Sequence, residues 1–459
     1  MRKGLVVLLA AVLVVAFALP AMADVSFFGY ARVIPTYYSN FDFDKNQPDA
    51  AIATEAGTAT GEAIRSELRL GWKAGGDKWK ILMTTESDLL YSQFNVDRSS
   101  GSNGSFFGIE RAEFTYAFSP ALELITGWPI SAADIGTGGV LYGDDHPIIG
   151  FRGKVTDNFK YQALYIPIFN APVAGQSTLS GDWRAYLLKP EFSVGTGGAN
   201  MSLNPILMFS DNRANNAKIM YYGLEGIGQF GFIKPSFEVI VADGEFRPTA
   251  TLAKRNIKSY AAFAGVELGL SKAFNPYIAG RYTKGDDNTT DTDVEGFVGI
   301  TDIGRFTPLM GMDGNILGES LSAGTYYNSF LYSYAPDRGV GGNNYGGFGN
   351  ASSGNNPGSK ILAVGAKGDI NEQFSYKAQV FGIWFDKTEN LPHPKSAAIA
   401  DKYAGTTLDV MLKYAFSKNF YASYIFSALL PGDGIKDQQP STADDTYAMV
   451  NTVNLFWAY

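Results

Sequence analysis

The chain has 459 residues, no cysteine and a formal net charge of −8 at pH 7. Without cysteine it cannot form disulfides, bind a metal through thiolate or carry a c-type haem motif, and its acidity argues against nucleic acid as a partner. The mean hydropathy of −0.05 is far too polar for a bundle of membrane-spanning helices.

The N-terminus has the layout of a secretory signal peptide. Two basic residues precede an apolar run over 4–19, and small residues, Ala21 and Ala23, stand where a signal peptidase reads. The run is shorter than the ~20 apolar residues of a spanning helix. We therefore expect residues 1–23 to be removed and 24–459 to form one domain, since no linker divides the chain before the long loop near its middle.

The main signal in the rest of the chain is an alternation of apolar and polar residues. It is clearest over 64–74, where one parity is apolar and the other carries Arg65, Glu67, Arg69 and Lys73. Successive side chains of a strand point to opposite faces, so this segment has one apolar and one charged face. A helix would spread the charges around its circumference. The pattern recurs over 112–118, 374–384, 407–416 and 420–427.

Alternation of this kind, with turn residues between segments, predicts eighteen strands, with sixteen as the alternative. It is weakest in the first, eighth, ninth and tenth ranges. The predicted ranges are 25–38, 63–74, 79–90, 107–118, 121–128, 147–156, 159–168, 182–193, 200–210, 216–228, 232–243, 257–270, 273–284, 359–369, 373–385, 405–416, 419–429 and 444–459.

The gaps between these ranges alternate between short and long. Outer-membrane barrels have short periplasmic turns, long outer loops and an even number of strands, whereas a soluble sandwich has no reason for such regularity. Aromatic residues of the apolar parity flank the short gaps, as in the aromatic belt of a membrane protein. They are Trp72, Trp79, Phe118, Phe159, Phe274, Phe374, Phe416 and Phe420. The expected fold is an all-β, antiparallel transmembrane barrel, because unpaired strand edges are too costly in hydrocarbon.

One outer loop carries a run of acidic residues after the thirteenth predicted strand. Clustered carboxylates are ligands for Ca²⁺, but the spacing does not match a twelve-residue EF-hand loop, so a solvated acidic loop is the main interpretation. The run consists of Asp286, Asp287, Asp291, Asp293 and Glu295. The glycine- and asparagine-rich remainder of the loop, to residue 358, contains Thr325–Tyr334, a candidate extracellular hairpin or plug.

Catalytic chemistry is not expected. The two histidines, His146 and His393, fall in predicted outer loops. A Ser-His-Asp hydrolase needs a histidine within reach of its serine, and the chain has no G-x-S-x-G nucleophile motif. Two histidines make a poor transition-metal site, so no metal site is expected apart from the calcium alternative above, and no cofactor is expected.

Several segments resemble bacterial outer-membrane porins. They are the signal peptide, Ile109–Phe114 leading into Ser119-Pro120, and Leu122–Trp128. The general pattern is most similar to homotrimeric porins. The eighteen strands, and Thr407–Phe416 followed by Leu429–Asp433, are also similar to sugar-specific and alginate-export-type channels. The last strand, ending on Tyr459, resembles the signal read by the barrel-assembly machinery, although that signal usually ends in Phe.

The resemblance implies a third outer loop that folds into the barrel and narrows the pore. Here this loop is 129–146, with Asp134, Asp144 and Asp145 and several glycines for a tight backbone path. Basic side chains are expected on the inner wall across from it, where a transverse field would orient polar solutes. These residues are Arg65, Arg69, Lys73, Arg111, Arg152 and Lys154, with Glu67 and Glu113 as acidic neighbours.

The resemblance also implies a function. We expect a water-filled channel in the outer membrane of a Gram-negative bacterium, for passive diffusion of ions and small hydrophilic solutes. Expected partners are outer-membrane lipid and lipopolysaccharide, two further copies of the chain in a homotrimer, and the barrel-assembly machinery. The alternatives are a substrate-selective channel of the sugar or alginate-export type, and a non-conducting barrel used in adhesion or as a sleeve for an electron-transfer protein.

Overall fold

In the computed structural model, eighteen long strands form one sheet. The structure describes residues 24–40, 52–54, 57–59, 62–91, 106–134, 136–144, 146–169, 183–213, 216–247, 253–288, 291–300, 357–389, 401–437 and 447–459. The long strands are β1 (Asp24–Ser39), β4 (Glu62–Gly75), β5 (Trp79–Tyr91), β6 (Phe106–Ser119), β7 (Leu122–Trp128), β10 (Ile148–Thr156), β11 (Phe159–Phe169), β12 (Trp183–Thr196), β13 (Ala199–Asn212), β14 (Ala217–Phe230), β15 (Ile233–Phe246), β16 (Arg255–Leu268), β17 (Asn275–Thr283), β19 (Ser359–Asp369), β20 (Phe374–Phe385), β21 (Tyr403–Ala415), β22 (Phe420–Pro431) and β23 (Ala448–Ala458).

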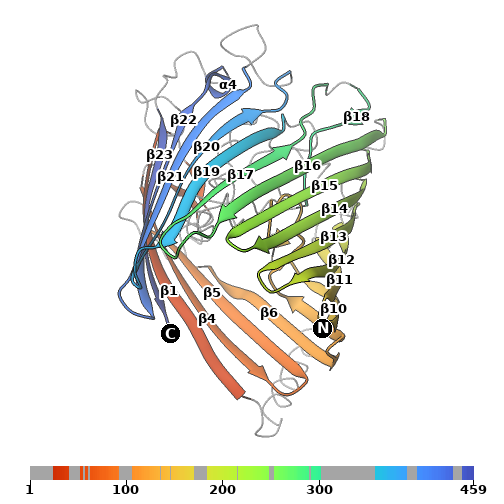
Figure 1. Cartoon of the computed structure of the whole chain (residues 1–459), viewed down its shortest axis with the longest axis vertical. Coiled ribbons are helices and arrows are strands. Elements are labelled where there is room, and N and C mark those ends of the chain that lie inside the picture. Colours follow the sequence, from red (N-terminus) through yellow and green to blue (C-terminus); the bar gives the residue numbers. More distant parts are fainter. Residues whose placement is uncertain are drawn as a thin grey trace.

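The sheet closes on itself. Each long strand pairs antiparallel with the next in the chain, and β23 returns to β1, where Tyr30 lies opposite Ala458 and Thr36 opposite Thr452. Figure 1 shows these strands tilted in one curved wall, with β4 between β1 and β5. All eighteen predicted strands are confirmed, their ends within four residues of the observed ones, and the alternative of sixteen is wrong.

The two faces of the closed sheet differ in polarity. In β4, the side chains of Leu68 and Leu70 point outward and are 42% and 44% exposed, whereas Glu67 points inward and is 1% exposed. An apolar outer face and a polar interior are the arrangement that a barrel needs in a bilayer. The alternation read from the sequence therefore predicts the two faces correctly.

Aromatic rings gather at the end of the barrel that has the short turns. Trp79, Phe159, Phe374 and Phe420 each begin a strand directly after a short turn. Phe420 stacks on Phe416 on one side and on Trp457 on the other, with 4.8 Å between ring centroids in both pairs. This part of the predicted aromatic belt is thus a run of stacked rings from the end of β21 across β22 to β23, as expected at a membrane interface.

A second layer of chain lies inside the barrel. Residues 131–144, between β7 and β10, and residues 293–300 pack together, and the Ile300 N–H donates to the Leu141 carbonyl at 2.7 Å. Their apolar side chains, including Tyr142 and Val298, share a buried cluster with inward-facing residues of β11 to β16, such as Met208 and Tyr221. These strands are apolar on both faces because the inner layer covers one of them.

Several short elements were not predicted. They are the pair β2 (Ile52–Thr54) and β3 (Gly57–Ala59), the pair β8 (Ser131–Ala132) and β9 (Gly143–Asp144), β18 (Asp293–Val294), which runs parallel to β16, and α4 (Asp433–Lys436). In the part of the chain that the structure describes, no helix is long and apolar enough to cross a membrane. The predicted signal peptide (1–23) and the Thr325–Tyr334 hairpin lie outside the described residues, as do Asp145 and His393.

Candidate functional site

The loop between β7 and β10 forms the core of the candidate site. The chain leaves β7 at Trp128, forms the small hairpin of β8 and β9 in which Ser131 pairs with Asp144, and returns to β10 at Ile148. Leu141 and Tyr142 within it are fully buried. The predicted third outer loop therefore folds against the inner wall of the barrel, and we call residues 131–144 the inner loop.

Asp134 holds the inner loop in its conformation. Its carboxylate accepts hydrogen bonds from the N–H groups of Leu141 at 2.7 Å and Tyr142 at 3.1 Å, and its carbonyl accepts one from the Thr137 N–H at 3.1 Å. Asp134 has no exposed surface. Burial raises the pKa of its carboxyl, while a hydrogen bond with the Glu238 side chain and the two N–H donors act in the opposite direction. Asp134 thus stabilises the conformation of the loop from inside it, and its carboxyl does not face open solvent.

Two glutamates of the barrel wall anchor the inner loop. Glu238 of β15 accepts hydrogen bonds from the Thr137 hydroxyl at 2.5 Å and the Gly138 N–H at 2.7 Å. Glu225 of β14 lies 3.2 Å from the same hydroxyl, whose single proton points to Glu238, and it pairs with Lys189 of β12 at 2.9 Å. The Lys189 ammonium also donates to the Ala133 carbonyl at 2.7 Å. This cluster links three strands to one loop through buried, charge-assisted hydrogen bonds.

Gly138 sits where no side chain fits. A Cβ on this residue would lie 2.8 Å from the Cβ of Phe263 and 3.0 Å from a carboxylate oxygen of Glu238. Its neighbour Gly139 has φ of 58°, in the left-handed region that favours glycine. The tight backbone path expected for the glycines of this loop is thus seen at these two positions.

The opposite side of the barrel carries a network of paired charges. In strand order, β1 and β4 lie about half the circumference from β14 and β15. Arg69 pairs with Glu67 at 2.5 Å, with Glu86 at 2.9 Å and with Glu110 at 2.6 Å. Arg32 of β1 also contacts Glu67, and the Arg69 guanidinium lies 5.4 Å from the centre of the Tyr30 ring. This wall therefore offers both cations and carboxylates to the lumen.

The other arginines predicted for the inner wall are paired as well. Arg111 contacts Glu113 at 3.3 Å, and Arg152 contacts Glu123 of β7 at 2.6 Å. Their strands flank the wall that carries Arg69, by strand order. Sequence reasoning placed these arginines on the inward face but missed most of their carboxylate partners, so the wall is mixed in charge rather than solely basic.

The remaining predicted residues are more scattered. Lys73 is exposed, and Lys154 pairs with Asp157 in a short turn at 2.6 Å. Asp144 takes part in the β8–β9 pairing through its backbone, and its side chain, like that of Arg65, lies outside the described residues.

The acidic run after β17 does not converge on one point. The Asp286 carboxylate accepts from the N–H groups of Asn288 and Glu295, Asp287 pairs with Lys387, and Glu295 pairs with Lys284 at 2.6 Å. Among the described residues, no group of three or more acidic or histidine side chains is arranged to hold a metal ion. Ca²⁺ binding by Asp286, Asp287, Asp291, Asp293 and Glu295 remains a prediction without structural support.

Sequence reasoning missed the residues that anchor the inner loop. Glu225 is the one charged residue of the inward parity in β14. On the inward face, Lys189 directly follows Leu187 in β12 and Glu238 directly precedes Ile240 in β15, and both of these neighbours are buried and apolar. A charged residue at an otherwise apolar inward position was the available signal, because a buried charge requires a partner. Which group is the partner can be identified only when the position of the inner loop in the barrel is known.

Comparisons with known proteins identify the fold. No family model matches the chain, and no curated protein matches it. Among solved structures, Pseudomonas aeruginosa OccK2 (OpdF) is 12% identical with a TM-score of 0.54, over 95% of this chain and 97% of that one. P. aeruginosa OccK5 (OpdH) is 10% identical with a TM-score of 0.55, over 95% and 98% of the two chains.

A third similar structure is a BenF-like porin from Pseudomonas fluorescens Pf-5. It is 11% identical with a TM-score of 0.53, over 96% of this chain and 99% of that one. OccK2 has also been solved in complex with glucuronate. At these identities the likeness shows the fold alone: the chain has the barrel architecture of these outer-membrane porins along nearly its whole length.

Proposed function

We propose that this chain, which has the fold of outer-membrane porins, forms a water-filled channel in the outer membrane of a Gram-negative bacterium. The observation that carries the proposal is the one-sided inner layer. The inner loop packs against β11 to β16, while paired charges line the inward faces of β1 and β4 on the other side. A barrel of sixteen to eighteen strands is too wide to be filled by its own side chains.

The proposed mechanism is passive diffusion through a narrowed lumen. The inner loop reduces the cross-section, and its buried anchors to Glu225 and Glu238 keep it fixed. Opposite it, Arg69 and its three glutamates present donors and acceptors to a solute that has shed part of its hydration shell. Selectivity would come from the size of the gap and from these charges. No catalytic step is part of the proposal.

A substrate-selective channel is the second candidate. It is favoured by the mixed charge of the wall around Arg69, which suits a solute with both hydroxyl and carboxylate groups. The glucuronate in one OccK2 structure is a solute of that kind. Such a channel would bind its solute in the gap and would show a current that the solute blocks at low concentration.

Solute-influx measurements separate these candidates. Proteoliposomes containing the purified protein should swell in isotonic solutions of small neutral sugars, with rates that fall steeply as the sugar grows. Swelling with one class of solute only, such as sugar acids, would replace the general channel by the selective one. Absence of swelling with every small solute would leave only the non-conducting barrel.

The assembly and processing of the protein are part of the same proposal. We propose cleavage before Asp24 and a homotrimer in the membrane, on the sequence pattern of residues 1–23 and the resemblance to trimeric porins. Mass determination of the mature protein tests the first. Cross-linking in mild detergent tests the second, and only monomer on the gel would remove it.

A further inference from the structure

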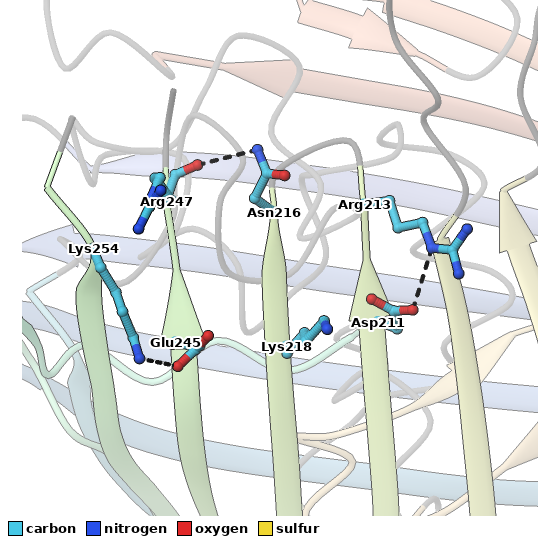
Figure 2. Close-up of a pocket in the computed structure, with 7 residues that line it drawn as sticks. All are labelled: Asp211, Arg213, Asn216, Lys218, Glu245, Arg247 and Lys254. Atoms are coloured by element: carbon cyan, nitrogen blue, oxygen red, sulfur yellow. Dashed lines mark hydrogen bonds and ion pairs between the residues drawn. The ribbon is translucent and has the colours of Figure 1, made fainter. Parts of the chain in front are cut away.

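A pocket of about 320 Å³ lies at the loop ends of β13 to β16. This volume is at the lower end of the roughly 300–1,000 Å³ of small-ligand sites. Figure 2 shows its side chains spread across the ends of neighbouring strands. The residues that line it are Asp211, Arg213, Asn216, Lys218, Glu245, Arg247 and Lys254.

The pocket faces away from the lumen. Along β14, the odd-numbered residues such as Ile219 and Tyr221 are buried toward the interior, whereas Lys218 and Tyr222 are exposed on the opposite face. Lys218 pairs in register with Asp211 of β13 and with Glu245 of β15. Directly opposite residues in adjacent strands point to the same face. The three side chains therefore form a row on the outer surface of the barrel.

The pocket sits just beyond the apolar part of the outer surface. Four residues below Lys218, the row Tyr222, Val241 and Tyr260 runs across β14, β15 and β16, and each side chain is more than 40% exposed. Four residues correspond to ~13 Å along a strand, or roughly 10 Å along the membrane normal at a barrel tilt of about 40°. Tyrosine is enriched at the level of the lipid headgroups, so the pocket lies at or slightly above that level.

The charge of the pocket is positive on a protein that is negative as a whole. Four cations, Arg213, Lys218, Arg247 and Lys254, face two carboxylates, whereas the chain carries a net charge of −8. Lys254 pairs with Glu245, and the Arg213 guanidinium contacts Asp211 at 3.4 Å. Within the described part of the chain, no carboxylate forms an ion pair with Lys218 or Arg247. Lys218 and Arg247 share the two carboxylates of the pocket, Asp211 and Glu245, with Arg213 and Lys254, so the lining keeps two more cations than anions.

We propose that this pocket binds a phosphate group of an anionic glycolipid in the outer leaflet, with the acyl chains reaching the apolar surface of the barrel below the row of Tyr222, Val241 and Tyr260. Arginine and lysine together suit a phosphate, since guanidinium binds it through a planar fork and ammonium as a point charge. The Asn216 amide donates one N–H to the Arg247 carbonyl at 3.5 Å and has a second N–H for a neutral hydrogen bond to the ligand. The source is the membrane rather than a solute in transit, because the pocket opens on the outer face of the barrel. The inference rests on the proposed outer-membrane location.

The test is lipid binding by native mass spectrometry of the full-length mature protein in detergent, with diphosphorylated lipid A as the probe. The variant is Lys218→Gln with Arg247→Gln. A basic residue near an anionic lipid surface contributes enough that losing two should weaken binding about 30-fold. The matched control is Lys272→Gln with Lys418→Gln, two exposed lysines in short turns at the other end of the barrel. The control should bind lipid A as the unmodified protein does.

Several outcomes would overturn the proposal. Equal binding by the double variant and the control would show that the pocket does not hold the phosphate. Displacement of lipid A by inorganic phosphate at millimolar concentration, or equal binding of a dephosphorylated lipid A, would show that the site is not built for a phosphorylated lipid. Channel conductance is measured on the same samples. If the unmodified protein shows no conductance, the channel proposal fails, whereas the lipid-binding result is unaffected.

Discussion

Replacing Lys189 by methionine should release the inner loop. Lys189 is 8% exposed and holds the Glu225 carboxylate at 2.9 Å and the Ala133 carbonyl at 2.7 Å. Methionine keeps much of the volume but removes the cation, so Glu225 is left as a buried carboxylate. Removing one partner of a buried ion pair costs about 3–5 kcal/mol. Part of that cost is avoided if the loop detaches and water reaches Glu225.

Two measurements report whether the inner loop is released. The free energy of unfolding, from denaturant titration of the protein folded in vesicles, should fall by up to about 3–5 kcal/mol. The single-channel conductance should rise, or become unstable between levels, because the loop no longer occupies a fixed part of the lumen. The two changes should appear together, since both come from the same anchor.

Two further variants make the Lys189 experiment decisive. Adding Glu225→Gln to Lys189→Met removes the unpaired charge, so most of the lost stability should return. Lys154→Met is the control, because Lys154 is half-exposed and its partner Asp157 is almost fully exposed, and such surface pairs contribute little. The reasoning is refuted if Lys189→Met behaves like this control, or if the added Glu225→Gln makes the protein still less stable.

Three other changes test the site. Gly138→Val should displace the inner loop and raise conductance in planar bilayers, because a Cβ there already lies 2.8 Å from Phe263; unchanged conductance would contradict the packing. Serine in place of the three inward arginines leaves their carboxylates uncompensated, so the reversal potential in a salt gradient should shift toward cation preference; an unchanged potential would place the constriction elsewhere. These arginines are Arg69, Arg111 and Arg152. Burial raises the pKa of Asp134, so its contribution to loop stability is present below the ordinary value of about 4 and is lost as pH rises through the raised pKa. Hydrogen exchange of the loop should therefore quicken with rising pH beyond the intrinsic rate. Asp134→Asn should reduce this excess, and the Glu238 carboxyl, which shares a hydrogen bond with Asp134, supplies the part that is left.

The fold could be predicted from the sequence because each strand faces lipid on one side and the aqueous lumen on the other. Apolar and polar residues therefore alternate along most strands. In β4, lipid selects Leu68 and Leu70 on one face and the lumen selects Glu67 on the other. The pattern fades in β12, β13 and β14, where inward residues such as Met208 and Tyr221 are apolar. The inner loop covers those positions, so the weak alternation marks the wall that the loop contacts.

The site could be predicted only in part. The position of the inner loop and the inward direction of Arg69 follow from the resemblance and from strand parity. The partners of Arg69 do not, because Glu86 and Glu110 come from other strands and their contact depends on register. A bulge in β6 adds to this, since the pairing of β5 and β6 shifts between Thr84 and Thr85. One extra residue changes which side chains face inward.

Planar-bilayer conductance of the purified, refolded protein tests the central claim most directly. A closed ring of eighteen strands with a one-sided inner loop predicts stable, stepwise currents that grow with salt concentration. Conductance should also change in the Lys189→Met and Gly138→Val variants, in which the inner loop is loosened. A folded barrel that inserts into the bilayer and passes no current, with or without these substitutions, would contradict the account.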